Sequence, residues 1–287
     1  MIKDQVDCIV RFHNASRLAE LSRCVFSLVG QQYRPLHIIV AVQRFTDAQV
    51  AETCGVLEPF LKLPYPPTFT LKNWQNPLPV DARAVLLNMG LEAATGQYVA
   101  FLDYDDLLYP EAYALLVRRL KETGKAIAFA SVRVINAHVF PGFLYVAGVK
   151  DAPFAGRNLN DLFRANFCPI HSFLIDRSIV SPSILSFDTT MIIEEDYDLL
   201  LKICAAYPSD FETLQTIIGD YYYKNDGSNT IVMNGIASDS YTLELERAHA
   251  CIELRKKTTF VAIEVQKQLN VRKLSPSLTV QDAIEDY

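Results

Sequence analysis

The chain has 287 residues and is 50% hydrophobic, which is enough for a sizeable core in one large or two small domains. Its 33 acidic and 27 basic side chains give a net charge of −6, so no nucleic-acid partner is expected, because unspecific binding needs basic patches. Six cysteines lie in apolar segments without CxxC spacing, which argues against a zinc site or disulfide framework and favours a reduced, cytosolic compartment.

Strand and helix signals alternate through the first half of the chain. β-Rich or continuous apolar runs predict strands, and apolar residues at helical spacing predict the helices between them. The expected strands are residues 6–12, 36–42 and 98–102, and the expected helices are residues 18–28, 47–60, 82–94 and a segment that Pro110 opens. This alternation predicts a parallel α/β sheet, in which ligands collect at the carboxyl ends of the strands.

The second half is less regular. Residues 136–160 are rich in proline and glycine and are expected to form a loop. Further strands are expected at residues 126–134, 173–175 and 216–223, a helix at 195–207, and one or two long amphipathic helices within 239–269.

Three carboxylates, Asp103, Asp105 and Asp106, directly follow the apolar run 98–102. If the strand stays extended, Asp103 and Asp105 point the same way and offer oxygen ligands to a hard cation such as Mg²⁺ or Mn²⁺. Such an ion would leave positions for phosphate oxygens and neutralise a diphosphate leaving group. The alternative is a polar turn whose aspartates cap the next helix.

Four blocks, in order, resemble inverting nucleotide-sugar glycosyltransferases of family 2, which have the GT-A fold. They are VDCIVRFHN, SLVGQQYRPLHIIVAV, LLNMGLEAATGQYVAFLDYDD and EEDYDLLLKI, and the resemblance covers roughly residues 5–205. It implies a Rossmann-like α/β fold, a mixed sheet with flanking helices. Residues 1–235 would form the glycosyltransferase domain, residues 236–270 a C-terminal helical extension, and residues 271–287 a flexible tail.

The resemblance also implies roles at the nucleotide-sugar site. Asp105 would bind Mn²⁺ or Mg²⁺, Asp103 would share the metal shell or contact the ribose, and Asp106 would cap a helix or support the other two. His13 lies where the family has an aromatic residue that packs on the base. Arg83 lies close to a basic position that reaches the nucleotide. The simpler alternatives are a loop histidine and a surface salt bridge.

Two departures from the family pattern affect this site. The second strand of the family ends in Asp-Asp-Gly-Ser, whereas this chain has VQRF at residues 42–45. Gln43 keeps a donor and an acceptor for a uracil or thymine edge, and Arg44 either adds a phosphate contact or lies in solvent. Arg11 replaces the proline of the opening motif and adds a basic group near the nucleotide pocket.

A second acidic group begins the helix in EEDYDLLLKI. Inverting transfer needs a base that removes the proton of the acceptor hydroxyl. By the resemblance, Asp196 is this base and Glu195 orients the acceptor or the base. A helix N-terminus stabilises negative charge, so we expect a low pKa for Asp196. Glu194 and Asp198 are expected only to compensate the helix dipole.

Two further segments resemble parts of the family's sugar and diphosphate sites. In NFCPIHSFLID, His171 is a candidate for contacts with sugar hydroxyls; a histidine at a strand edge is the alternative. YYYKNDGSNT resembles a loop that closes over the diphosphate, in which Lys224 would contact phosphate and Gly227 would provide flexibility. A plain hairpin turn explains the same letters.

Together these features predict a metal-dependent, hexosyltransferase-type enzyme. It would move a sugar from a nucleotide-diphosphate donor to a glycan or lipid-linked acceptor in bacterial polysaccharide or cell-surface glycan synthesis. The start of the chain does not resemble a signal peptide, and no apolar run reaches about 18 residues. We therefore expect a cytoplasmic protein whose membrane contact, if any, is peripheral and uses the helices after residue 239.

Two other functions stay open. A sugar-nucleotide pyrophosphorylase needs a glycine-rich, arginine-containing loop after its first strand, and RFHNASRLAE contains no glycine. A nucleotide-sugar-binding module without turnover is compatible with the changed Asp-Asp segment, although the retained DxD and Glu-Asp groups argue against it. The sequence does not specify the sugar, the base, the acceptor, the linkage or the oligomeric state.

Overall fold

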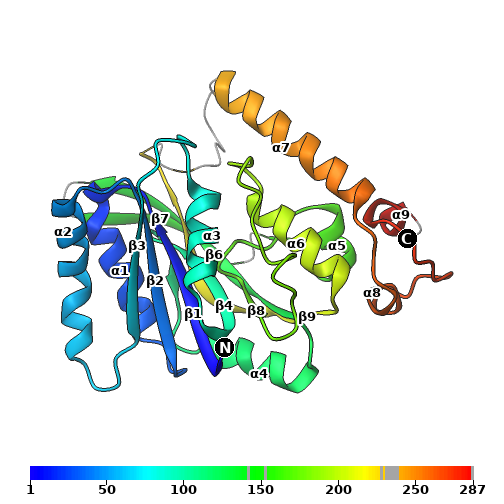
Figure 1. The fold of residues 1–287 in the computed structure, drawn as a ribbon, viewed down its shortest axis with the longest axis horizontal. Coiled ribbons are helices and arrows are strands. Elements are labelled where there is room, and N and C mark those ends of the chain that lie inside the picture. Colours follow the sequence, from blue (N-terminus) through cyan, green and yellow to red (C-terminus); the bar gives the residue numbers. More distant parts are fainter. Residues whose placement is uncertain (141–142, 152–153, 227–228, 230–238, 286–287) are drawn as a thin grey trace.

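The computed structural model describes residues 1–140, 143–151, 154–226, 229 and 239–285 (Figure 1). The strands are β1 Ile2–Phe12, β2 Leu36–Gln43, β3 Thr68–Trp74, β4 Gly96–Asp103, β5 Leu107–Leu108, β6 Ile127–Phe140, β7 Phe143–Lys150, β8 Phe173–Asp176 and β9 Ser209–Lys224. The α-helices are α1 Leu18–Val29, α2 Asp47–Leu57, α3 Arg83–Ala93, α4 Ala112–Thr123, α5 Leu159–Arg164, α6 Glu195–Ala206, α7 Asp239–Thr258, α8 Ile263–Gln268 and α9 Val280–Glu285.

Within these residues the strands form one mixed, nine-stranded sheet in the order β3-β2-β1-β4-β8-β6-β9-β5, with β7 paired to β6. β3, β2, β1 and β4 are parallel to one another. β8 runs antiparallel to both β4 and β6. The expected mixed α/β sheet with flanking helices is therefore present.

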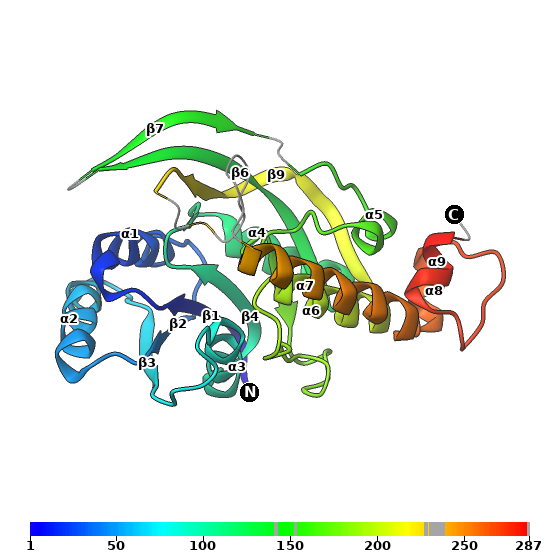
Figure 2. The same ribbon diagram turned by 90° about the horizontal axis from the view of Figure 1, so that it is seen from above.

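The strand period of two divides the core between the two faces of the sheet. On β1, Cys8 and Val10 belong to one buried cluster with α1 and α4, whereas Ile9 belongs to the other with α3, α5 and α6. Figure 2 shows α1 and α3 on opposite sides of the parallel strands. Helices therefore cover both faces, as the continuous apolar runs of these strands require.

The parallel strands place their carboxyl ends at one edge, and their register fixes which side chains meet there. Arg11 on β1 lies directly opposite Asp103 on β4. Two residues earlier, Ile9 and Phe101 form the equivalent pair, and both are buried on the α6 side of the sheet. Because side chains alternate, Arg11 and Asp103 point to that same side.

Residues 136–160, expected as a loop, contain a β-hairpin instead. β6 and β7 pair antiparallel from Val134–Lys150 to Phe140–Phe143, and the hairpin extends from the body of the molecule (Figure 2). β7 is exposed at most of its positions, so it lacks the one-sided apolar pattern that identifies a strand. Pro141 and Gly142, which favoured a loop, lie outside the described residues.

The C-terminal segment forms helices α7 and α8 as expected, but its last residues differ from the expectation. α7 packs along α6, with Ala248 and Ile252 buried in the core cluster that contains Ile9. Residues 271–285 do not form a loose tail, because α9 buries Val280 and Ala283 against α5 and α7. A pair of small apolar residues in a six-residue helix is too short a pattern to recognise. None of the described helices is both long and apolar enough to cross a membrane.

We expect Ile252→Ala to lower the free energy of unfolding by about 2–5 kcal/mol, because Ile252 is only 3% exposed and its loss would leave a cavity beneath α7. The matched control is Leu254→Ala on the same helix, where the side chain is 62% exposed and the change should stay within about 0.5 kcal/mol. Urea unfolding of both variants measures the difference. Equal effects would mean that α7 is not part of the core.

Candidate active site

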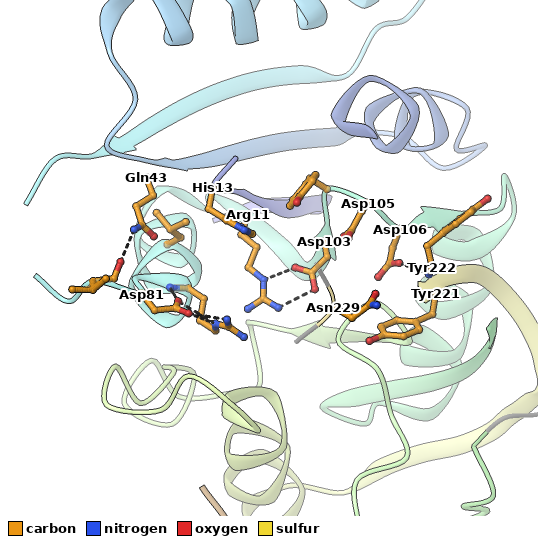
Figure 3. A pocket seen from close by; sticks show the side chains of 14 residues that line it. Arg11, His13, Gln43, Asp81, Asp103, Asp105, Asp106, Tyr221, Tyr222 and Asn229 are labelled. Atoms are coloured by element: carbon orange, nitrogen blue, oxygen red, sulfur yellow. Dashed lines mark hydrogen bonds and ion pairs between the residues drawn. The ribbon is translucent and has the colours of Figure 1, made fainter. Parts of the chain in front are cut away.

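A cavity of about 320 Å³ opens where β1, β2 and β4 end (Figure 3). Acidic, basic and aromatic side chains form its walls, as a site for a charged ligand with an aromatic base requires. The candidate residues from the sequence that line it are Arg11, His13, Gln43, Arg83, Asp103 and Asp105. A cavity is therefore present at the carboxyl ends of the parallel strands, where the sequence predicted a ligand site.

Arg11 joins the two acidic groups that the sequence separates by almost a hundred residues. Its Nε and Nη2 donate to the two oxygens of Asp103, the second bond at 2.9 Å, and its Nη1 donates to Oε1 of Glu195 at 2.6 Å. Burial acts to raise the pKa of Asp103, but the Arg11 guanidinium outweighs it and lowers that pKa, so Asp103 is ionised at neutral pH. The acidic turn, residues 103–106, and the start of α6 thus meet across one partly buried cation.

Lys224 is the second cation beside the acidic turn. Its Nζ lies 2.6 Å from Oδ2 of Asp105 and 3.0 Å from Oε2 of Glu20, and its side chain is 0% exposed. β9 reaches this position because it pairs with β5 directly after the turn. Lys224, which was predicted to contact phosphate, is therefore a buried counterion of Asp105 and Glu20 in this structure. Gly227, the proposed flexible point of the loop, lies outside the described residues.

Asp106 belongs to the lining of the cavity although it is almost fully buried, whereas His171 does not line the cavity. Asp106 Oδ1 accepts a hydrogen bond from the Tyr222 N–H at 2.8 Å and so supports β9 instead of capping a helix. Burial raises the pKa of Asp106 well above its ordinary value and lowers that of His171 to about 4. The His171 side chain is 0% exposed and stacks on Tyr221, so in this structure it does not reach the cavity where a sugar would lie.

At the end of β2, two residues of the stretch that replaces the family's Asp-Asp-Gly-Ser hold a neighbouring loop. Gln43 donates through Nε2 to the Val80 carbonyl at 2.7 Å and accepts through Oε1 from the Ala82 N–H at 3.1 Å (Figure 3). Arg44 Nε donates to the Asn76 carbonyl at 2.8 Å. These bonds use one N–H and one oxygen lone pair of the Gln43 amide, which leaves its second N–H and second lone pair for a ligand.

His13 and Arg83 lie on the wall of the cavity beside residues that sequence reasoning missed. The His13 ring meets Tyr104 edge to face, with centroids 5.5 Å apart. Arg83 Nη2 donates to Oδ2 of Asp81 at 2.7 Å, which is the salt bridge that the sequence left as an alternative. Tyr104 lies inside the acidic turn and Asp81 two residues before Arg83. Their proximity to recognised residues was the only signal available.

Asp196 is the candidate base at the start of α6. Its Oδ1 accepts hydrogen bonds from the Tyr197 N–H at 2.7 Å and from Asn166 Nδ2 at 3.4 Å. Burial, together with the adjacent Glu195 charge, raises the pKa of Asp196 to about 7. The expectation of a low pKa was wrong, because desolvation outweighs the hydrogen bonds and the helix N-terminus.

The sequence was also compared with known proteins. The family described as "Glycosyl transferase family 2" matches residues 7–181, which is more than half of the chain. The chain belongs to this family. An uncharacterized glycosyltransferase, YibD of Escherichia coli (strain K12), is 30% identical over 125 residues, which are 44% of this chain and 33% of that protein. The matched region thus spans about a third of the length of that relative.

Solved glycosyltransferases share the fold at low sequence identity. The structure of S. aureus TarS 1-349 in complex with UDP-GlcNAc has a TM-score of 0.63 and 12% identity over 93% of this chain and 71% of that chain. A longer S. aureus TarS structure is covered to 42%. The mannosyltransferase PcManGT from Pyrobaculum calidifontis, in complex with GDP-Man and Mn²⁺, has a TM-score of 0.56 and 16% identity over 95% and 76%. These neighbours confirm the GT-A fold of this family 2 chain.

The acidic turn does not fit the divalent ion predicted for Asp103 and Asp105. Both oxygens of Asp103 accept hydrogen bonds from Arg11, and Oδ2 of Asp105 accepts one from Lys224 Nζ. Among the described residues, no group of three or more His, Cys, Asp or Glu side chains is placed to hold a metal. Two resident cations would also repel an incoming divalent ion. In this arrangement Arg11 and Lys224 neutralise the two carboxylates that were predicted to bind the metal.

Proposed function

We propose that the protein is an inverting glycosyltransferase that moves a sugar from a nucleotide-diphosphate donor to an acceptor hydroxyl. Family membership supports the reaction class, and solved relatives of the same fold bind UDP-GlcNAc, UDP and GDP-Man. The observation that carries the proposal is the Arg11 contact with both Asp103 and Glu195. This contact supports a single site, in which the donor side at Asp103 and the acceptor side at the start of α6 are neighbours.

On the donor side, the diphosphate gains negative charge as it leaves and needs positive charge that is already in place. Arg11 and Arg83 line the cavity, and Lys224 lies just behind Asp105. His13 and Tyr104 provide ring surface for the base at the same opening. We do not propose metal dependence, because Arg11 and Lys224 already neutralise the carboxylates of the acidic turn.

On the acceptor side, Asp196 would remove the proton of the attacking hydroxyl. Its raised pKa suits this role, because a base whose pKa lies near the working pH combines ionisation with proton affinity. Glu195 keeps its carboxylate on Arg11 and so fixes the first turn of α6, on which Asp196 lies. Inversion follows if this base and the diphosphate lie on opposite sides of the sugar.

We further propose that the acceptor is a glycan or lipid-linked sugar of bacterial polysaccharide synthesis, reached at a membrane surface by peripheral contact. α7 exposes Leu243 and Leu254, which would suit such contact. Vesicle co-sedimentation of the wild type and of a Leu243→Ser/Leu254→Ser variant would test this part separately from transfer.

A panel of nucleotide sugars tests the transfer itself. Purified protein is incubated with UDP-GlcNAc, UDP-glucose or GDP-mannose without acceptor, and release of UDP or GDP is followed. We expect slow, saturable release from one donor, because water can replace the acceptor at Asp196. Binding without release, even with candidate acceptors, would favour a binding module. Failure of every donor to bind would overturn the proposal.

The rate should depend on pH through Asp196. A base is active only when it is ionised, and the pKa of Asp196 is about 7, raised by burial and Glu195 and opposed by Arg11. At saturating donor, kcat should therefore fall by about tenfold per pH unit below that value and level off above it. Initial rates between acid and mildly alkaline pH measure this. A flat profile across neutral pH would exclude Asp196 as the base.

A further inference from the structure

Lys224 is more deeply buried than we would expect for a lysine on a mobile loop that binds phosphate. Its side chain is 0% exposed, although it ends in an ammonium group. Asn229, on the cavity wall, also holds the backbone of this residue, because the Lys224 N–H donates to Asn229 Oδ1 at 2.9 Å. Lysine is almost never fully buried without a partner, so the position is built around its charge.

The partners of Lys224 come from two separate elements. Asp105 belongs to the acidic turn after β4, and Glu20 belongs to α1. Two carboxylate oxygens within 3.0 Å of the Nζ atom favour the charged ammonium form of Lys224. A permanent positive charge therefore lies against Asp105, the residue expected to bind a divalent ion.

A divalent ion could bind Oδ2 of Asp105 only by displacing the ammonium. The displacement would break one of the two ion pairs of a buried lysine and leave it only Glu20, which is unfavourable. Asp103 is a weaker alternative ligand, because each of its oxygens already accepts a hydrogen bond from the Arg11 cation. The acidic turn thus already has a cation on each carboxylate that the sequence assigned to the metal.

We propose that Lys224 is a built-in substitute for the divalent ion, so that this chain binds its nucleotide donor without metal. The inference rests on the proposed function, since it concerns the donor site of that reaction. It assigns a positioning role: the ammonium neutralises Asp105 and keeps the turn compatible with a diphosphate. It also predicts that removing the ammonium will create a metal requirement.

The test compares the wild type with Lys224→Met. UDP and GDP binding is measured by calorimetry in EDTA and in Mn²⁺, and binding of Mn²⁺ alone is measured by the loss of its free EPR signal. For the wild type, we expect nucleotide affinities that agree within about twofold in the two buffers, and an unchanged EPR signal. For Lys224→Met, we expect weak nucleotide binding in EDTA, recovery in Mn²⁺ and a reduced EPR signal.

Two further variants serve as controls. Lys256→Met removes another buried lysine, whose Nζ bonds to Glu253 and the Arg164 carbonyl away from the cavity, and it should gain no Mn²⁺ binding. Lys224→Arg keeps the charge and should behave as the wild type. A general loss of packing would weaken nucleotide binding in both buffers and would not create a metal site.

Several outcomes would overturn the inference. A wild type that binds Mn²⁺ and loses nucleotide in EDTA contradicts it, even if Lys224→Met does not fold. A folded Lys224→Met protein that gains no Mn²⁺ binding also contradicts it. If neither UDP nor GDP binds the wild type, the proposed function fails for these donors. The EPR comparison then still tests Lys224 by itself.

Discussion

Asp196→Asn is expected to lower kcat by about 10²–10⁴-fold while the dissociation constant for the donor stays nearly unchanged. The amide keeps the shape of the side chain but cannot accept the proton of the acceptor hydroxyl. Asp196 lies on α6 and does not line the cavity with Asp103 and Asp105, so donor binding should not depend on it. Calorimetric donor binding and single-turnover rates separate the two effects.

The matched control is Glu194→Gln, two residues earlier in the same acidic segment. Glu194 lies near His249, at 3.8 Å, and among the described residues it forms no ion pair with an arginine, so its loss should leave kcat within about twofold. The remaining pH dependence is a second readout, because Asp196→Asn should remove the inflection near pH 7. Turnover that survives in Asp196→Asn would assign the base to another residue.

Arg11→Met is expected to lower the free energy of unfolding by about 3–5 kcal/mol, because it leaves the buried Glu195 and the partly buried Asp103 without their shared counterion. Transfer should be lost as well, since the strand end and α6 would no longer be joined. Urea unfolding at neutral pH measures the first effect. Arg118→Met is the control: this arginine is 64% exposed in a 4.0 Å ion pair, and its loss should cost about 0–1 kcal/mol.

A double variant shows whether the cost arises from the carboxylates. Adding Glu195→Gln to Arg11→Met removes one of the two unpaired charges, so part of the lost stability should return. If the double variant is instead less stable by the sum of the two single effects, Arg11 and Glu195 act independently. The bridge across the cleft would then not be an energetic unit.

The sequence was most informative where local rules apply. Apolar runs such as residues 36–42 predicted the parallel strands, and the strand period of two placed Asp103 on one face of its strand. The carboxyl-edge rule then located the cavity. The resemblance to family 2 identified the start of α6, and the structure places it within reach of Arg11.

The sequence was least informative where distant segments meet. Lys224 was recognised as a cation near the diphosphate, but its pairing with Glu20 depends on the approach of β9 to α1, which no spacing reveals. The pKa of Asp196 depends on burial by neighbouring elements, and so the helix-dipole argument gave the wrong direction. β7 is too exposed and α9 is too short for either to leave a clear apolar pattern in the sequence, so the pairing of β7 and the packing of α9 could not be predicted.

A crystal structure with bound UDP or GDP, whichever nucleotide binds more tightly, tests the central claim most directly. The account expects the diphosphate in the cavity beside Asp103 and Asp105, with Arg11 between it and α6 and with Asp196 facing the space beyond the terminal phosphate. A nucleotide bound elsewhere, or a terminal phosphate that points away from α6, would contradict the assignment of donor site and base to one cleft.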